Sequence, residues 1–435
     1  MNQILIVCLV ICVLTIISYV WGKISMATTA MLSFAAFVIT GCIKPEDALA
    51  TFANPNGIMI MSMFVVAAGL QRTQFVKIVA KSVNKIANGS LVKVMAGYVL
   101  ISIILSQFIQ SPLIVFGIMA PMMSATCESM GINDSKVMFP LGVSAIATCS
   151  ALPLGSGATV AAELNGYLQA AKYTDFTVAL TDPMKARFPV VILVALYCIF
   201  FAAKFAPAEP SVAAKLEGVG RKPEEKEPLK PFQEKAGYII FFGVTLCLLF
   251  QQQLSHVITA PTWLICFVGA LLMVVCGVLK PREATGALNI SMFLVFVGAM
   301  AMGSALTASG AGDLIGGAIA GVANSLGNPY LIGLVFFLVP FILTQFMQNR
   351  AVMLIFIPIA IQACKSMNAN PVGIIIMVQA ACLTAFMTPM ATPAVPMYMA
   401  AGGYDLKSVV KQSLIPAVII CAVSVLWTMT VIPLY

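Results

Sequence analysis

Apolar segments long enough to span a membrane follow one another along most of the chain, and they come in the same order twice. Runs of about 17–25 apolar residues are typical of membrane-spanning helices. In the first half the pattern predicts segments near 3–21, 24–43, 57–71, 73–88, 91–109, 113–130, 136–167 and 186–205. In the second half it predicts segments near 238–254, 261–279, 288–306, 310–325, 328–347, 351–366, 371–402 and 412–433. The pattern therefore indicates an all-α polytopic membrane protein.

Short motifs repeat between the two halves at a nearly constant offset. The most similar pair is Leu-Ser-Gln-Phe-Ile-Gln at 105–110 and Leu-Thr-Gln-Phe-Met-Gln at 343–348. Further pairs are Lys44-Pro45 with Lys280-Pro281, Gly89-Ser90 with Gly327-Asn328, Pro121 with Pro358, Ser129-Met130 with Ser366-Met367, and Tyr167 with Tyr404. A constant offset over most of each half predicts a duplicated unit, the usual construction of a transporter made of two repeats.

Composition places most of the surface in lipid. Hydrophobic residues make up 60% of the chain, charged residues 9%, and the mean hydropathy is +1.00. So few charges cannot cover a soluble protein of 435 residues, so we expect the lipid bilayer as the main surroundings and no nucleic-acid partner. The 12 cysteines show no CxxC or metal-ligand spacing, and we expect no metal and no cofactor. The polar stretch 206–236, rich in Pro, Glu and Lys, predicts a solvated linker between the halves.

The paired segments 91–109 with 113–130, and 328–347 with 351–366, are open to two interpretations. Each pair is either two full spans or one re-entrant hairpin whose tip stops inside the membrane. Hairpins give five crossings in each half and opposite orientations of the halves, hence about ten spans, two inverted repeats and two hairpins. With the N-terminus outside, most of the 24 Lys and Arg residues then lie on the cytoplasmic side, as the positive-inside rule requires.

The predicted cytoplasmic group comprises Lys23, Arg72, Lys77, Lys81, Lys85, Lys93, Lys136, the basic residues of 204–235, Lys280, Arg282, Lys407 and Lys411. The predicted outer group comprises Lys44, Lys172, Lys185, Arg187 and Lys365, and Arg350 is left in the membrane. This places the chain in the inner (cell) membrane with a cytoplasmic linker and both termini outside. Segment 73–88 carries three of its lysines on one helical face and predicts an amphipathic helix on the inner leaflet.

The turns of the two hairpins carry polar residues where lipid would tolerate none. They read Gln110-Ser111-Pro112 and Gln348-Asn349-Arg350. The second helix of each hairpin begins there, so its N–H groups and positive dipole end favour an anion. The interrupted segments add a second pair of polar breaks, at 150–159 and 388–393. From these breaks we select Ser156, Thr159, Thr388, Thr392 and Pro393 as further substrate-binding candidates, the alternative being simple packing kinks.

Arg350 is the most informative single residue. A guanidinium in the bilayer is costly unless it is paired or hydrated, and its planar fork suits a carboxylate or a sulfonate. Contact with a substrate is one interpretation, and a structural or gating ion pair with Glu163 is the other. Glu163 itself is open to an interfacial or a proton-coupling role.

At these residues the chain resembles the divalent anion–sodium symporter family, within the wider ion transporter superfamily. The resemblance is carried by Phe346-Met347-Gln348-Asn349-Arg350, Phe356-Ile357-Pro358, Thr388-Pro389-Met390-Ala391-Thr392-Pro393 and Gly402-Gly403-Tyr404. It implies a homodimer with a scaffold formed by 1–88 and 237–325. It also implies a transport domain, formed by 89–205 and 326–435, that carries the site across the membrane as an elevator.

The chain departs from the family at the hairpin tips. The family's tips read Ser-Asn-Thr and each binds one sodium ion and part of the substrate, whereas here they read Gln-Ser-Pro and Gln-Asn-Arg. The resemblance leaves Ser106, Ser111, Thr344 and Asn349 as ion-binding candidates. Because Arg350 replaces a Thr beside the second ion site, we expect sodium-independent transport.

Other function classes fit less well. An intramembrane enzyme would need an HExxH or GxSxG motif, or paired carboxylates in a span, and the sequence has none of these. A cation/proton antiporter would place carboxylates, not an arginine, at the breaks. We therefore expect a secondary active transporter of a small organic anion, a di- or tricarboxylate, working as an exchanger. The alternatives are a sodium-coupled symporter of sulfate- or sulfonate-like anions and a cation/proton antiporter.

Overall fold

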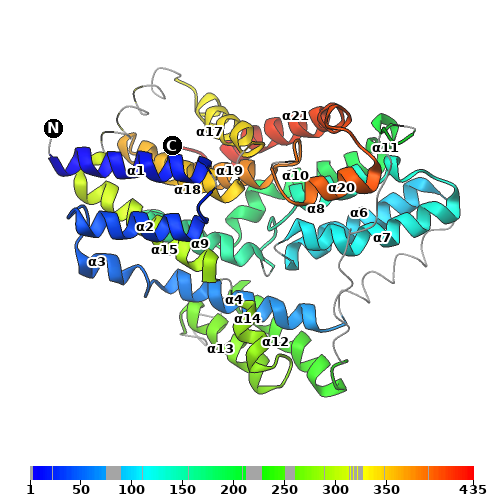
Figure 1. Cartoon of the computed structure of the whole chain (residues 1–435), viewed down its shortest axis with the longest axis horizontal. Coiled ribbons are helices and arrows are strands. Elements are labelled where there is room, and N and C mark those ends of the chain that lie inside the picture. The colour runs from blue at the N-terminus through cyan, green and yellow to red at the C-terminus, as the bar shows by residue number, and fades with distance from the viewer. Residues whose placement is uncertain are drawn as a thin grey trace.

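The computed structural model describes residues 3–21, 23–74, 90–109, 111–154, 156–207, 209–211, 228–249, 260–288, 290–312, 314, 317, 321, 327–346, 348–389 and 391–435. Every regular element within these ranges is a helix, which confirms the predicted all-α fold (Figure 1). Of the predicted amphipathic segment 73–88, only residues 73 and 74 are described. The tip residue Gln110 lies outside the described residues.

The first repeat consists of α1 (Gln3–Trp21), α2 (Met26–Ile39), α3 (Pro45–Ala50), α4 (Pro55–Arg72), α6 (Leu91–Phe108), α7 (Pro112–Met130), η1 (Asp134–Lys136), α8 (Met138–Ala147), α9 (Ser156–Ala170), α10 (Asp182–Phe200) and α11 (Ala202–Phe205). The second consists of α12 (Pro231–Leu249), α13 (Thr262–Val275), α14 (Pro281–Ala287), α15 (Ile290–Ser309), α17 (Pro329–Thr344), α18 (Asn349–Ser366), α19 (Val372–Leu383), α20 (Ala394–Gly402) and α21 (Leu406–Val431). Both interrupted segments are broken in the middle, as predicted.

Two details of the sequence prediction were wrong. The short helices α3 and α14 were not predicted, although each begins at the proline of a repeated Lys-Pro pair. Proline favours the first helical position because its fixed φ suits a helix and its missing N–H would have no partner there. The linker 206–236 was predicted too long, because α12 already begins at Pro231.

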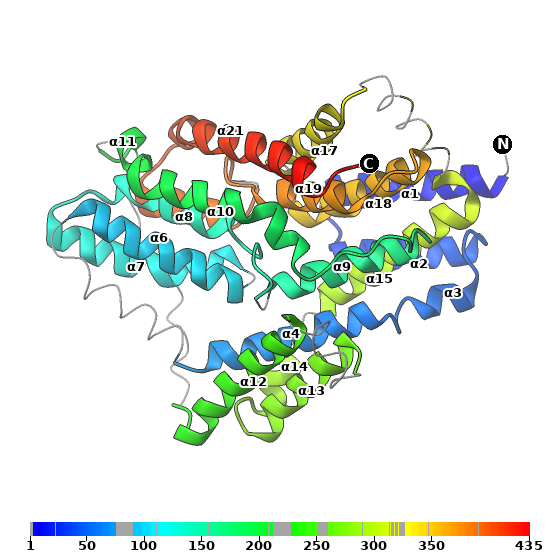
Figure 2. The same cartoon turned by 180° about the vertical axis from the view of Figure 1, so that it is seen from behind.

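Equivalent helices of the two repeats make equivalent contacts. Helix α4 packs against α13 and α15 packs against α2, while α6 packs against α8 and α17 against α19. In Figures 1 and 2 the equivalent helices α4 and α15 run in opposite directions, so the repeats are inverted. Helices α10 and α21 pack directly on each other and join the repeats. The depth of the two hairpin tips in the bilayer stays a prediction.

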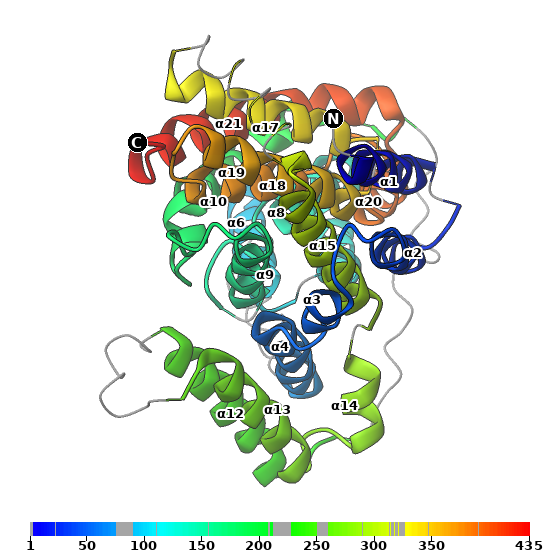
Figure 3. The ribbon, with the colours of Figure 1, turned by 90° about the vertical axis from the view of Figure 1, so that its left-hand side faces the viewer.

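Apolar side chains form three buried clusters, and these divide the helices into two groups. The largest cluster is built mainly from α6–α10 and α17–α21. The other two are built mainly from α4 with α12–α15, and from α1–α3 with α15. Viewed end on, α12–α14 lie at one edge of the molecule and α17 and α21 at the opposite edge, with α4, α9 and α15 between them (Figure 3).

The two groups meet along a stripe of small residues on α9. Ala158, Ala162, Gly166 and Ala170 recur every fourth position, and three of them are buried in the cluster around α4 and α12. A Cβ on Gly166 would lie 2.6 Å from the ring of Phe296 on α15. The two helices therefore approach as closely as small residues permit, which is typical of helix contacts in membranes.

The helices have the length and surface of a multi-pass membrane protein. Within the described residues, five helices are long and apolar enough to cross a bilayer, and six shorter apolar helices accompany them. Large apolar side chains point outward from the rim of the bundle, among them Ile17, Leu32, Val275 and Val418. Such a surface is stable only against lipid.

Replacing Gly166 with leucine should destabilise the fold by about 1–3 kcal/mol, because the new side chain must displace Phe296. The matched control is Gly243→Leu in α12, where no atom lies within 4 Å of the added Cβ. Both substitutions gain similar helix propensity, so their difference reports the steric clash. Thermal unfolding in detergent measures it, and equal melting temperatures would contradict the close packing of α9 on α15.

Candidate transport site

The first break, between α8 and α9, is held by one buried glutamine of the first hairpin. Gln107 Oε1 accepts hydrogen bonds from the backbone N–H groups of Ala151 (3.1 Å) and Leu152 (2.9 Å). Its Nε2 donates to the carbonyls of Thr148 (2.9 Å) and Ile103 (2.8 Å). A single amide thus satisfies both donors and acceptors that the broken helix leaves without partners.

The second break, between α19 and α20, is held by the equivalent glutamine, whose side chain makes one bond to it. Gln345 Oε1 accepts from Met387 N (3.0 Å), and its Nε2 donates to Phe341 O (2.9 Å). The hydroxyl of Thr388, a predicted substrate-binding residue, donates to the backbone carbonyl of Gln345. The repeated motif therefore marks the two glutamines, whereas the sequence analysis selected their neighbours.

The second hairpin tip brings two of the ion-binding candidates together. The hydroxyl of Thr344 lies 2.9 Å from Asn349 Oδ1 and 3.2 Å from the carbonyl of Cys382 at the end of α19. Helix α18 begins at Asn349, and the exposed Gln348 is its N-cap residue. The tip of the hairpin and the end of the broken helix thus share a small group of oxygen atoms.

The first tip has different chemistry. Ser106 is fully buried, and its hydroxyl donates to the carbonyl of Ser102 in its own helix (2.7 Å). Ser111 is the half-buried N-cap residue of α7, and Pro112 is the first residue of that helix. The backbone carbonyl of Ser106 accepts from Ser150 N (3.3 Å), which fastens the hairpin to the first break.

Arg350 forms an ion pair with Glu163. Arg350 Nη1 lies 2.7 Å from both Oε1 and Oε2 of Glu163, so hairpin 2 is bonded to the broken helix of the other repeat. The side chain of Glu163 is 8% exposed and that of Arg350 is 36% exposed. The structure therefore contains the ion pair that was the alternative to direct substrate contact, and it leaves part of the guanidinium accessible.

The remaining candidates lie around the breaks. Helix α9 begins at Ser156, and Thr159 is buried one turn before Glu163 on the same helix. Thr392 Oγ1 accepts from Ala394 N (3.1 Å) and so caps α20, whose N-cap residue is the exposed Pro393. Polar contacts thus join the first tip helix to the first break, the second tip to the end of α19, and the second tip to α9.

Arg187 was wrongly placed by the sequence analysis, which assigned it to the outer aqueous side. The structure buries it to 3% exposure near the start of α10. Its Nη1 donates to the carbonyl of Cys149 (2.8 Å) and its Nη2 to that of Ala147 (3.0 Å), the last residue of α8. A basic residue inside the apolar segment 186–205 was the available signal, but position near the end of a span favoured an interfacial assignment.

In the described part of the chain, three charged side chains contact the end of α8 or lie at the helix α9 that follows the first break. Arg187 donates to the carbonyls of Ala147 and Cys149, and Arg350 is paired with Glu163 of α9. Together these side chains carry one net positive charge, which would favour an anionic ligand over a cation.

Sequence comparison identifies related transporters. The profile of the family described as citrate transporter (CitMHS) matches residues 16–352 and 257–435, nearly the whole chain. An uncharacterized transporter of Haemophilus influenzae is 21% identical over 419 residues, which covers 92% of this chain and 86% of that protein. The uncharacterized transporters YfbS of Escherichia coli (26% identical over 203 residues) and sll0640 of Synechocystis (30% over 136 residues) match 47% and 31% of this chain. The matches span only 32% and 22% of these two longer proteins.

Solved structures of transporters share the fold. The YdaH transporter of Alcanivorax borkumensis superposes with a TM-score of 0.59 at 15% identity, over 88% of this chain and 87% of its own. MtrF of Neisseria gonorrhoeae, described as belonging to a class of antimetabolite efflux pumps, gives 0.58 at 13% identity over 88% and 82%. The comparisons confirm the class of transporter that the hairpin motifs indicated, and they agree with the expectation that the protein is not an enzyme.

Replacing Gln107 or Gln345 with leucine should lower the free energy of unfolding by about 1–3 kcal/mol for each buried backbone group that loses its partner. Leucine keeps most of the volume, so the loss reports hydrogen bonds and not a cavity. Gln71→Leu, an exposed position in α4, is the control and should change little. Melting temperatures in detergent decide the point, and two variants as stable as the control would show that the glutamines do not support the breaks.

Proposed function

This chain belongs to the citrate transporter family, and we propose that it is a secondary active transporter of a small organic anion, exchanged by an elevator mechanism without sodium. A di- or tricarboxylate is the substrate class that we infer. One observation carries the proposal: hydrogen bonds and an ion pair connect the hairpin tips with the helix breaks, around the buried Arg187 and Glu163 and the partly exposed Arg350. A net positive charge among them favours an anionic ligand.

The chemistry of the second tip supports a carboxylate substrate. Arg350 is the second residue of α18, so its guanidinium and the N-terminal N–H groups of that helix favour the same negative ligand. Glu163 already presents a carboxylate to this guanidinium at 2.7 Å. A substrate carboxylate would therefore compete with Glu163, and its binding would loosen the contact between hairpin 2 and α9.

The packing of the helices supports an elevator in which 89–205 and 326–435 move against 1–88 and 237–325. Most contacts within the two groups have a counterpart in the other repeat, but most of those of the equivalent helices α9 and α20 do not. Helix α9 packs on α4 and α15, whereas its counterpart α20 packs mainly on α7 and α8. Such asymmetry between equivalent elements is expected when one body rests on one side of the other.

The two groups of helices end at different places along the molecule (Figure 1). Helices α6, α7 and α20 extend beyond α4 at one end, and α1–α3 extend farthest at the other. The first end holds residues that the charge distribution assigns to the cytoplasm, so we infer an inward-facing arrangement. The inner-membrane location, the outer termini, the cytoplasmic linker and a homodimer formed through the scaffold belong to the same proposal.

The interface between the two groups is suited to sliding. On α9 it consists of the small-residue stripe Ala158, Ala162, Gly166 and Ala170. At one end of the stripe, Gln169 Oε1 accepts hydrogen bonds from Asn54 Nδ2 (3.0 Å) and Asn56 Nδ2 (3.4 Å) of α4. An apolar contact between small side chains, with hydrogen bonds only at one end, can slide at a small cost in free energy, because few buried hydrogen bonds must break.

Sodium independence now has a different basis from the one expected from the sequence. Arg350 alone would repel a cation 4 Å away by about 4 kcal/mol at an effective dielectric of 20. Its ion pair with Glu163 offsets much of that repulsion. The stronger support comes from the first tip, where Pro112 begins the helix and the hydroxyl of Ser106 bonds to its own helix.

A sodium-coupled symporter is the second candidate function, because the second tip retains ligands that suit sodium. Thr344 Oγ1 and Asn349 Oδ1 lie 2.9 Å apart beside the carbonyl of Cys382. Hydroxyl, amide and carbonyl oxygens are hard ligands, which prefer hard cations. The two functions differ in one measurable quantity, the dependence of transport on sodium.

Substitution at the ion pair tests the substrate class. Arg350→Lys keeps the positive charge but loses the planar guanidinium that can donate two hydrogen bonds to one carboxylate. Citrate or succinate should therefore bind at least about tenfold more weakly. Glu163→Gln removes the competing carboxylate, so the same anions should bind several-fold more tightly. Isothermal titration calorimetry on purified protein measures both effects. Unchanged affinity in both variants would place the site elsewhere.

Transport by purified protein in liposomes tests the coupling. Uptake of labelled citrate or succinate should rise with the concentration of the same anion inside the vesicles and stay constant when choline replaces sodium. Protein-free vesicles and vesicles with the Arg350→Lys variant are the controls. Uptake that rises steeply with a sodium gradient and ignores the internal anion would establish the symporter instead.

A further inference from the structure

Side-chain donors bond to the backbone carbonyls at the end of α8, at the first break. Three successive carbonyls there accept hydrogen bonds: Ala147 from Arg187 Nη2 (3.0 Å), Thr148 from Gln107 Nε2 (2.9 Å) and Cys149 from Arg187 Nη1 (2.8 Å). The C-terminal end of a helix carries a partial negative charge, and carbonyls at such half-helix ends are where transporters coordinate coupling cations. At this break the position is filled by a guanidinium.

No carboxylate pairs with Arg187 among the residues that the structure describes. The ion pairs found there join Arg72 to Glu283, Lys185 to Asp182 and Arg350 to Glu163. Arg187 contacts backbone carbonyls, and at 3% exposure it has almost no water. Carbonyl dipoles and the end of α8 therefore compensate its charge, as they would compensate a bound metal cation.

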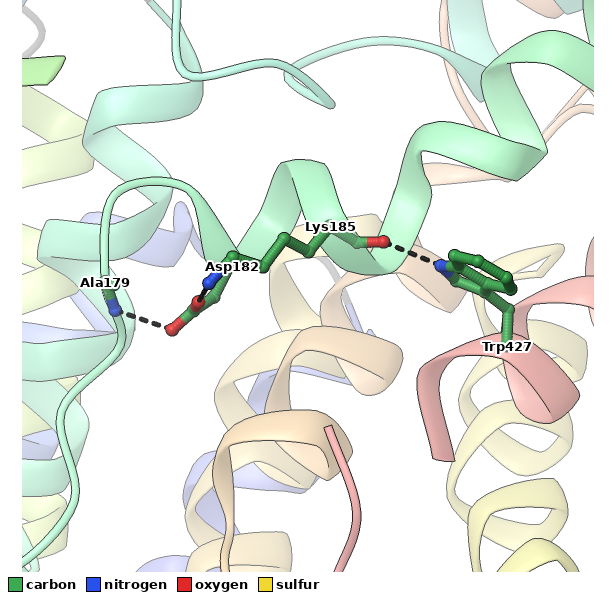
Figure 4. Close-up of polar contacts among 4 residues, drawn as sticks. All are labelled: Ala179, Asp182, Lys185 and Trp427. Carbon is green, nitrogen blue, oxygen red and sulfur yellow. Dashed lines mark hydrogen bonds and ion pairs between the residues drawn. The ribbon is translucent and has the colours of Figure 1, made fainter. Parts of the chain in front are cut away.

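Polar contacts of Asp182 and Lys185 hold the first turns of α10, which lead to Arg187 (Figure 4). Asp182 accepts from Ala179 N (2.8 Å) and from Lys185 Nζ (2.9 Å), which closes the start of the helix. Trp427 Nε1 of α21 donates to the carbonyl of Lys185 (2.8 Å). That carbonyl is available because Pro189, four residues later, has no N–H to donate to it. A residue of the last helix thus anchors the turn that precedes Arg187.

The second break is stabilised by neutral groups instead. The carbonyl of Cys382 accepts from the hydroxyl of Thr344 (3.2 Å), and that of Phe386 accepts from the hydroxyl of Tyr398. The two repeats therefore build breaks of similar shape with different charge. The difference points to a role for the positive charge beyond supporting the backbone, because hydroxyl groups suffice for that at the second break.

We propose that Arg187 is a tethered cation that takes the place of a dissolved coupling cation at the first break. The inference deepens the proposed function and rests on it, because it states why an anion carrier of this fold works without sodium there. The charge stays with the protein in both directions of movement. An empty carrier then crosses the membrane with a positive charge that no anion balances, which is unfavourable in lipid. Exchange of one anion for another follows, since a bound anion is needed for the return.

Neutral variants of Arg187 test the proposal through a readout that needs no substrate. Arg187→Ala and Arg187→Gln expose the carbonyls of Ala147 and Cys149 to a free cation. Their melting temperatures in detergent should be at least about 2 °C higher in 100 mM NaCl than in 100 mM choline chloride. Wild type should show no such difference. Lys185→Gln, which removes an equal charge from a half-exposed side chain two residues away, is the matched control and should also show none.

Each outcome decides the point. Folded neutral variants whose melting temperatures are equal in the two salts would overturn the proposal. If neither neutral variant folds, Arg187→Lys decides, because it keeps the positive charge. A folded lysine variant whose melting temperature is the same in both salts supports a tethered cation. If the lysine variant does not fold either, the guanidinium geometry is required and the proposal is overturned. If wild type binds neither citrate nor succinate while the neutral variants still respond to sodium, the proposed function fails and the tethered cation stands.

Discussion

A helix that stops inside a membrane leaves N–H and carbonyl groups that no water reaches, and each of them needs a partner from the protein. This protein has two broken helices whose interruptions are partly buried in the bundle, and the same need applies to them. Gln107 reaches from the first helix of its hairpin to both sides of the first break, and Gln345 accepts a hydrogen bond from Met387 N at the second break. The hairpins are consequently fixed to the broken helices, and their tips lie beside the same breaks. A polar region inside an apolar bundle results, and it is the region in which we propose that the substrate binds.

The duplication supplied two copies of this device, and the copies have diverged in charge. The first break holds Arg187 on the carbonyls of Ala147 and Cys149, whereas the second uses hydroxyl groups. The ion pair between Arg350 and Glu163 crosses from one copy to the other. Backbone geometry is thus preserved by two different sets of side chains, because hydrogen-bond donors of any charge satisfy a carbonyl. The choice of donor sets the electrostatic character of each half of the site.

The order and bounds of most helices could be predicted from the sequence, because apolar runs and polar interruptions are local signals. The inversion followed from the charge distribution, and the repeated motif led to the region of the tips. The role of Gln107 and Gln345 could not be predicted, since a glutamine in a polar motif looks the same in the sequence whether its amide faces a ligand or a backbone. Arg187 was misplaced because a basic residue near the end of a span usually lies at the interface. Its partner, the end of α8, is distant in sequence, and no local pattern encodes such a contact. The pairing of Arg350 with Glu163 was one of two open alternatives for the same reason.

The ion pair also bears on how the protein is made. Glu163 precedes Arg350 by 187 residues, so during synthesis it enters the bilayer long before its partner has left the ribosome. The carbonyl of Lys185 lacks its hydrogen-bond donor for even longer, because Trp427 lies on α21, 242 residues later in the chain. A buried carboxylate without a partner is costly in lipid and is held neutral or near water until a partner arrives. The contacts that complete the first repeat can therefore form only after the second repeat has been synthesised.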